Sequence, residues 1–168
     1  MWSYLAALWW GGDPDEPHPV TNMSRRDMYN VHKTWAAIYN KAYENGFVIF
    51  CRIFEADGET KGFFKFLDGT THDEMASSVT FKAHIVNLMS SLNNAVQYLS
   101  TPEVSVQVLR KIGTSHHARH IRRKHFQIFR EVVLGILKND LAHKPTMIAS
   151  WERFLDFCLK HIFATLTE

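Results

Sequence analysis

The sequence predicts a single all-α domain of a size that one hydrophobic core can support. Its 168 residues are 46% hydrophobic, which is enough to fill such a core. From Val79 onward, apolar residues recur every three or four positions, the period of an amphipathic helix. At Thr101-Pro102, a capping residue precedes a proline, an arrangement that favours the start of a helix. These three observations favour helices throughout the chain.

Residues 1–22 are predicted to be an extension, and residues 23–168 to form the domain. Three prolines fall within six residues, at Pro14, Pro17 and Pro19, and they disfavour regular structure there. Residues 1–12 are rich in tryptophan, but they are too short to span a bilayer and lack the basic start of a secretory signal. We expect this segment to fold back on the domain or on a partner, with a signal peptide or membrane contact as less favoured alternatives.

The first two helices of the domain follow from a cap and an apolar run. Ser24 with Asp27 three positions later predicts a helix that begins there and continues to about residue 42. Asn45-Gly46 is read as the junction that follows. The apolar residues 47–54 then predict a second helix, although this run alone could also form a strand. Asp57-Gly58 is expected to end it.

The middle of the chain alternates between loop and helix. A short turn is predicted around residues 63–66, and the polar residues 67–78 are predicted to be a loop. A long helix begins at Val79, and the next begins at Thr101-Pro102. Two further helices close the chain, one with apolar positions from Phe126 to Leu141 and one beginning near Pro145.

Charge and cysteine content narrow the class of function. The 19 basic and 17 acidic residues nearly cancel, and a net charge of +2 argues against a general nucleic-acid or membrane-surface binder. Cys51 and Cys158 lie in apolar stretches without a CxxC pattern. We therefore expect small buried thiols, a reducing compartment and a cytoplasmic location.

Two histidines lie on the apolar faces of separate predicted helices. His84 and His116 are 32 residues apart (116 − 84), room for the rest of one helix, a turn and most of the next. This spacing can place two imidazoles on either side of a flat metal cofactor, and imidazole is a good ligand for iron. A single histidine on an apolar face is more often a core residue, but two with this spacing favour haem.

The same residues resemble the globin family, and within it the hexacoordinate, neuroglobin-like type, from about Met28 to Ile162. The matching features are Trp35, Gly46, the stretch Phe50–Phe54, Phe64, the segment around His84, Leu88, the segment Leu109–His116, Phe126 and Ser150-Trp151. The proline that such globins usually carry after the second helix is replaced here by Gly58.

This resemblance implies a globin fold around haem b (iron protoporphyrin IX), with roles for seven residues. His116 would bind the iron on the proximal side, and His84 would either coordinate it on the distal side or stand off and hydrogen-bond a ligand. The remaining cofactor contacts would come from Phe50, Phe64, Leu88 and Ile112, with His120, or Arg119 beside it, as a partner for a haem propionate.

Other interpretations of the histidine-rich segment remain open. His117 competes with His116 for the proximal role, although one helical residue turns its side chain about 100° away. His116 and His120 could bind zinc, and the basic run 122–124 could be a targeting or nucleic-acid patch. Both alternatives are weak, because no further ligand lies nearby and the run is short.

The expected function is reversible binding of O₂, NO or CO, with His84 on the iron, in oxygen, redox or nitric-oxide sensing or scavenging. A reductase is an expected partner, and nucleic acid is not. Any enzymatic activity would come from the haem iron, and the sequence leaves that open. The alternatives are an ordinary five-coordinate oxygen carrier and a haem-free interaction or signalling protein that uses its N-terminal extension.

Overall fold

The computed structural model describes residues 5, 8–141 and 144–167, and in that part all regular structure is helical. The elements follow in the order α2 (Arg25–Tyr39), α3 (Ala42–Ala56), α4 (Gly58–Lys61), η1 (Lys65–Leu67), α5 (His72–Ser77), α6 (Val79–Gln97), α7 (Pro102–His117), α8 (Arg123–Gly135), η2 (Ile136–Asp140) and α9 (Pro145–Phe163).

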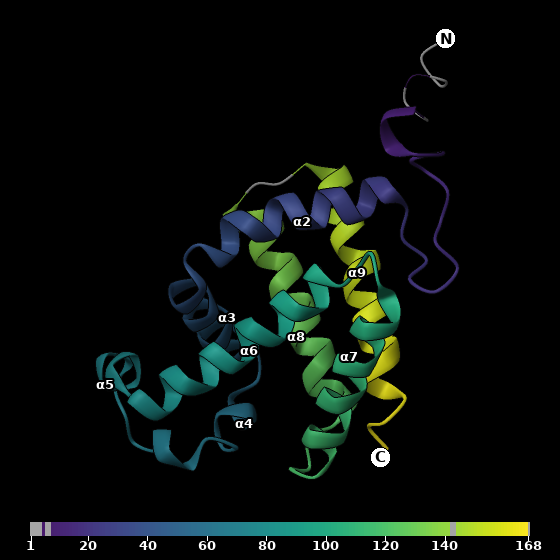
Figure 1. Ribbon diagram of the computed structural model, residues 1–168. Coiled ribbons are helices and arrows are strands. Elements are labelled where there is room, and N and C mark those ends of the chain that lie inside the picture. Colours follow the sequence, from purple (N-terminus) through teal and green to yellow (C-terminus); the bar gives the residue numbers. More distant parts are fainter. Residues whose placement is uncertain (1–4, 6–7, 142–143, 168) are drawn as a thin grey trace.

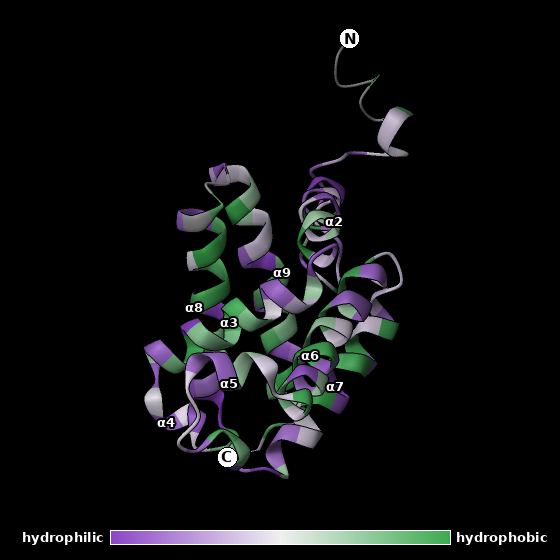
Figure 2. Cartoon of the chain, turned by 90° about the vertical axis from the view of Figure 1, so that its left-hand side faces the viewer, coloured by the Kyte–Doolittle hydropathy of each residue, from purple (hydrophilic) through white to green (hydrophobic). Residues whose placement is uncertain are grey.

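The helices pack in crossing pairs around one core. Helix α9 contacts both α2 and α7, while α3 packs against α6 and α8. Figure 1 shows α2 lying across one end of α8 and α9, and α4 and α5 gathered on the opposite side from α9. Hydrophobic and hydrophilic segments occur on the same helices in Figure 2, as expected for elements that bury one face. The all-α prediction is confirmed.

The first helix begins as its cap predicts. The Ser24 hydroxyl accepts a hydrogen bond from Asp27 N at 3.1 Å, and the Asp27 carboxylate accepts one from Ser24 N at 3.0 Å. Asp27 also accepts hydrogen bonds from Ser150 and Arg153 of α9, so the same residue fastens α2 to α9. Burial opposes its charge, but these hydrogen bonds and Arg153 together lower the pKa of Asp27.

The junction predicted at Asn45-Gly46 is wrong, because both residues lie inside α3. Gly46 serves packing instead of chain reversal. A Cβ at that position would lie 2.5 Å from Ile85 Cγ2 and 3.0 Å from Met89 Cγ of α6. The absence of a side chain therefore lets α3 and α6 approach closely, and Gly46 is one of the residues on which the globin resemblance rests.

The loop predicted at residues 67–78 is wrong in part, because it contains helix α5. Thr71 and Glu74 form a capping box in which Thr71 N donates to the Glu74 carboxylate at 2.8 Å. Asp57 ends α3 as expected, and its carboxylate accepts hydrogen bonds from Glu59 N and the Thr60 hydroxyl at the start of α4.

The end of α8 departs from a regular helix. Residues Ile136–Asp140 form a π-helical turn, which holds more residues per turn than an α-helix. The added residue rotates the positions that follow. Leu141, predicted to lie on the buried face, is therefore 49% exposed, whereas Leu137 stays buried.

The described part of the N-terminal extension contacts the start of α2. The Trp10 ring meets the Tyr29 ring edge-on, with centroids 5.5 Å apart, and the guanidinium of Arg26 lies 6.0 Å from the Trp10 centroid. Arg26 also forms an exposed ion pair with Asp15. Figure 1 shows this segment standing outside the bundle beside α2.

Two smaller expectations concern the membrane and the thiols. Among the helices of the described residues, none combines the length and apolar character that crossing a bilayer needs. Cys51 and Cys158 are both free, and Cys158 is fully buried. Cys51 is only half-buried on α3, with its sulfur 4.0 Å from His72 Nε2.

Candidate functional site

His116 lies in the last turn of α7, where a backbone hydrogen bond fixes its ring. Its Nδ1 lies 2.8 Å from the carbonyl oxygen of Ile112, one turn earlier in the helix. Because a carbonyl can only accept, Nδ1 carries the proton and the lone pair of Nε2 remains available to a metal. The ring of Phe126 packs against the imidazole with centroids 5.1 Å apart.

His84 lies on α6 between two aromatic rings. The centroid of its imidazole is 5.2 Å from that of Phe50 on α3 and 4.9 Å from that of Phe64, which follows α4. Phe81, one turn earlier on α6, is fully buried and packs on both phenylalanines. His84 is therefore held against aromatic rings from three segments of the chain.

The two histidines lie close enough for a charge on one to act on the other. Burial lowers the pKa of His84, and the positive charges that His116 and Arg119 can carry lower it further. Burial also lowers the pKa of His116, against the Ile112 hydrogen bond that favours the charged ring, and Arg119 adds to the lowering. Both imidazoles are thereby biased toward the neutral form that binds metal ions.

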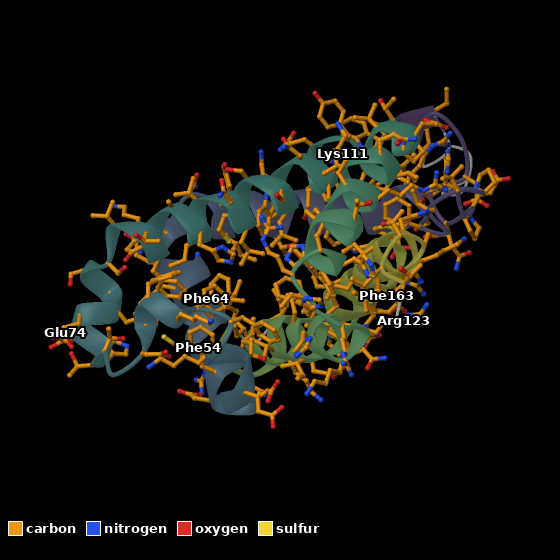
Figure 3. The ribbon with its side chains drawn as sticks, turned by 90° about the horizontal axis from the view of Figure 1, so that it is seen from below. Phe54, Phe64, Glu74, Lys111, Arg123 and Phe163 are labelled. Carbon is orange, nitrogen blue, oxygen red and sulfur yellow. The ribbon has the colours of Figure 1, made fainter. Side chains whose placement is uncertain are left out.

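Several apolar side chains on the segments that carry the two histidines, or packed against them, are only partly buried although they contact the core. They are Phe54, Phe64, Leu88, Leu92, Ile112, Phe126 and Phe163. Figure 3 shows Phe64 and Phe163 on opposite sides of a central region without side chains, seen along the axis from below. Half-exposed apolar walls around a gap are suited to a flat hydrophobic cofactor.

The donors and walls fit haem. The neutral imidazoles of His84 on α6 and His116 on α7 would supply nitrogen ligands to the iron, and aromatic and aliphatic side chains would enclose the porphyrin. Among the described residues, no cluster of three or more His, Cys, Asp or Glu side chains is arranged to hold a metal ion. The zinc alternative therefore has no support in that part of the chain.

Not all of the other predicted site residues lie with His84 and His116. His120 follows the end of α7 in a left-handed backbone conformation, with φ of 60°, and its exposed side chain lies beside that of His117. His117 is exposed too, and its Nδ1 is 3.4 Å from the Thr167 hydroxyl near the end of the chain. The structure thus brings together Phe50, Phe64, His84 and His116, and places His117 and His120 outside that group.

Sequence reasoning understated two contributors to the site. The sequence indicates Phe126 as an apolar helix position and as part of the resemblance, but its ring also packs directly against His116. Arg119 was considered only as a propionate partner, yet its charge acts on both histidines, while its guanidinium donates to the Ser115 carbonyl at 2.5 Å. The signal for Arg119 was its position three residues after His116, close to one helical turn.

Comparison with known proteins places the chain in a family. The globin family profile matches residues 48–162, more than half of the chain, and the protein therefore belongs to the globins. Cytoglobin-2 of Oryzias latipes is 25% identical over 158 residues, which cover 92% of this chain and 88% of that protein. Neuroglobin of Tetraodon nigroviridis is 25% identical over 136 residues, or 79% of this chain and 85% of the relative.

Solved structures show the same fold at lower identity. A hexacoordinated haem protein from an anhydrobiotic tardigrade superposes with a TM-score of 0.82 at 16% identity, covering 90% of this chain and 99% of that one. The hexa-coordinate haemoglobin of Drosophila melanogaster gives 0.77 at 19% identity, covering 84% and 94%. These likenesses establish the globin fold of the chain.

Proposed function

We propose that this globin binds haem b with His116 and His84 as its two axial ligands. The observation that carries the proposal is the pair of half-buried imidazoles on α6 and α7. They lie close enough for their charges to interact, and each packs against phenylalanine rings. The Ile112 carbonyl holds the Nδ1 proton of His116, which leaves Nε2 directed away from its own helix. Neighbours in the fold that are described as hexacoordinate support the same arrangement.

The haem iron would supply the centre for reversible binding of O₂, NO or CO. Phe50 and Leu88 would set the room available beside His84, and Phe64 would pack on the porphyrin face. On the proximal side, Ile112 and Phe126 would fix the plane of the His116 ring. If His84 occupies the sixth position, an external ligand binds only the fraction of molecules in which it has moved away, so apparent affinity falls by that fraction.

Such a site suits oxygen, redox or nitric-oxide sensing or scavenging better than bulk oxygen storage, and a reductase would be the partner that returns the iron to the ferrous state. We further propose a cytoplasmic location, supported by the two unpaired thiols, Cys51 and Cys158. Fractionation of the native cells would test the location, and protein recovered in a secreted fraction would contradict it.

One observation favours a second candidate, a haem-free interaction protein. The side chains of Leu5, Leu8 and Trp9 in the extension are 60%, 64% and 87% exposed. Exposed apolar side chains that lie together often mark a surface that binds a partner. The two candidates differ in one property. The globin proposal requires a Soret band in the purified protein, whereas the interaction proposal allows none even after hemin is added.

The variant His84→Leu tests axial coordination. Leucine has a similar volume but no nitrogen, so we expect haem to stay bound while the ferrous spectrum changes from six-coordinate to five-coordinate. Carbon monoxide should then bind faster, because no internal ligand has to leave first. His32→Leu, the same change on half-buried His32 of α2, is the matched control and should leave the spectrum unaltered. A ferrous spectrum identical to wild type in His84→Leu would exclude His84 as a ligand.

A further inference from the structure

A second pocket lies at the turn between α7 and α8, and none of the residues that form the histidine site lines it. Its volume is about 440 Å³, within the usual range for small-ligand sites. It is lined by His117, His120, Ile121, Arg122, Lys124 and Thr167. The proposed haem function uses none of these side chains except His120, whose propionate role is only an expectation.

The lining is cationic. Arg122 and Lys124 carry permanent positive charges, the imidazoles of His117 and His120 supply N–H donors, and Thr167 adds a hydroxyl. No carboxylate of the described residues lines the pocket. Such a set of donors around one cavity matches an anion with several oxygen acceptors, because charge-assisted hydrogen bonds to phosphate oxygens are stronger than neutral ones.

Two acidic side chains, Asp57 and Glu59, compete for Lys124. The Thr60 hydroxyl lowers the pKa of Asp57, and the charge of Lys124 lowers it further. Glu59 of α4 pairs with Lys124, with 3.3 Å between Nζ and Oε2. The Lys124 and Glu59 side chains are 53% and 84% exposed, so the pair contributes little and a phosphate can replace it. Arg122 has no carboxylate partner among the described residues.

The backbone of the turn adds further positive potential at the pocket. Arg122 is the N-cap of the 13-residue helix α8, and its backbone N–H already donates to His125 Nδ1 at 2.9 Å, which leaves the other N–H groups of the first turn to add to the positive end. The positive end of the α8 dipole therefore lies beside the cationic lining. His120 holds a left-handed conformation that is costly for a residue other than glycine, and such strain gathers at binding sites.

We propose that this pocket, which we call the basic turn pocket, binds a compact anion with phosphate groups, of the size of pyrophosphate. The anion would hydrogen-bond Arg122 and Lys124, with His117 or His120 and the Thr167 hydroxyl as further donors. The same chemistry is offered by a soluble oligophosphate and by the phosphate headgroup of a lipid. The site does not depend on whether His84 binds iron.

The test is calorimetric titration of the full-length protein, as purified with any bound haem, with sodium pyrophosphate against sodium chloride of equal ionic strength. The full-length protein is used because Thr167, which lines the pocket, is the penultimate residue of the sequence. We expect one binding site. Arg122→Gln and Lys124→Gln should each weaken binding about tenfold, the effect of losing one charge-assisted hydrogen bond.

Lys111→Gln is the matched control, because it removes one positive charge from an exposed position of α7 and Figure 3 shows Lys111 on the outer surface. It should change the affinity by less than about twofold, the size of a screened surface effect. Equal weakening by all three variants would mean a diffuse effect of net charge and would overturn the proposal, as would the absence of pyrophosphate binding to wild type.

Sedimentation with phosphatidylcholine vesicles that contain phosphatidic acid separates the two sources of phosphate. Binding of pyrophosphate without vesicle binding assigns a soluble ligand. Vesicle binding that Arg122→Gln and Lys124→Gln abolish, and Lys111→Gln does not, assigns a lipid headgroup. Vesicle binding that survives both pocket variants would come from another surface and would count against a lipid ligand for this pocket.

Discussion

Gly113 should tolerate no side chain, because α7 and α9 approach each other there more closely than a Cβ allows. A Cβ at Gly113 would lie 2.2 Å from the carbonyl oxygen of Ile162 and 2.3 Å from the Thr165 hydroxyl. An ordinary contact between carbon and a carbonyl oxygen is about 3.3 Å. Alanine at this position therefore requires α7 to move away from α9 by about 1 Å.

The energy follows from two opposing effects. Overpacking that shifts backbone costs about 1–3 kcal/mol, and more when backbone atoms make the clash. Alanine in a helix gains about 1 kcal/mol over glycine. Because the Ile162 oxygen is backbone and cannot turn aside, we expect Gly113→Ala to lower the free energy of unfolding by about 2 kcal/mol, which corresponds to a Tm lower by about 4–8 °C.

Gly135→Ala is the matched control. Nothing lies within 4 Å of a Cβ at Gly135, near the end of α8, so only the helix preference remains and the variant should be stabilised by about 0.5–1 kcal/mol. Urea unfolding followed by circular dichroism gives both values. A Gly113→Ala protein as stable as Gly135→Ala would refute the close approach of α7 and α9. Because His116 follows Gly113 by one helical turn, a shifted Soret band is also expected.

Three further substitutions test the proximal histidine and two buried polar contacts. His116→Ala should release haem readily during gel filtration because the proximal bond is lost, whereas His117→Ala should retain it. Thr34→Val should cost about 1–3 kcal/mol of unfolding free energy, because it leaves the buried Trp151 indole N–H, now 2.7 Å from the Thr34 hydroxyl, without an acceptor. Asp27→Asn should cost about 1.5–3 kcal/mol at pH 7 by removing charge-assisted hydrogen bonds. The difference in stability between Asp27→Asn and wild type should shrink below about pH 4. The pKa of Asp27 is lower in the folded protein than in the unfolded chain, so its carboxylate stabilises the fold fully above the unfolded-state pKa. This stabilisation is lost as the pH falls through the folded-state pKa.

Each of these has a result that would contradict it. Haem release from His117→Ala but not from His116→Ala would transfer the proximal role. For the threonine, the exposed Thr114→Val is the control, and equal small effects of both would mean that the Trp151 contact contributes little. A penalty for Asp27→Asn that is unchanged between pH 7 and pH 2.5 would show that packing, and not charge, accounts for it.

Local patterns predicted the helices that have strong signals of their own. The Ser24 capping box and the Thr101-Pro102 start both lie where the sequence placed them. Helix α5 was missed, although Thr71 and Glu74 carry the pattern of a capping box, because the polar residues around them outweighed it. Gly46 was misread for a different reason: a glycine that serves a turn and one that serves a helix crossing look alike until the partner helix is known.

The site was predictable to the extent that it follows helical periodicity. His84 and His116 lie on the faces that the three- and four-residue steps indicated. The π-helical turn at Ile136–Asp140 could not be predicted from the sequence, because packing against neighbouring helices decides where such a turn forms. The basic turn pocket could not be predicted from the sequence either, because Thr167 and His117 are 50 residues apart in the chain and meet only in the fold.

The absorption spectrum of the purified protein reduced with dithionite tests the central claim most directly. The account predicts a low-spin ferrous spectrum with sharp, resolved α and β bands and no added ligand, the sign of iron held by both His84 and His116. A broad high-spin ferrous band would contradict ligation by His84 while keeping the haem. No Soret band after addition of hemin would contradict haem binding itself.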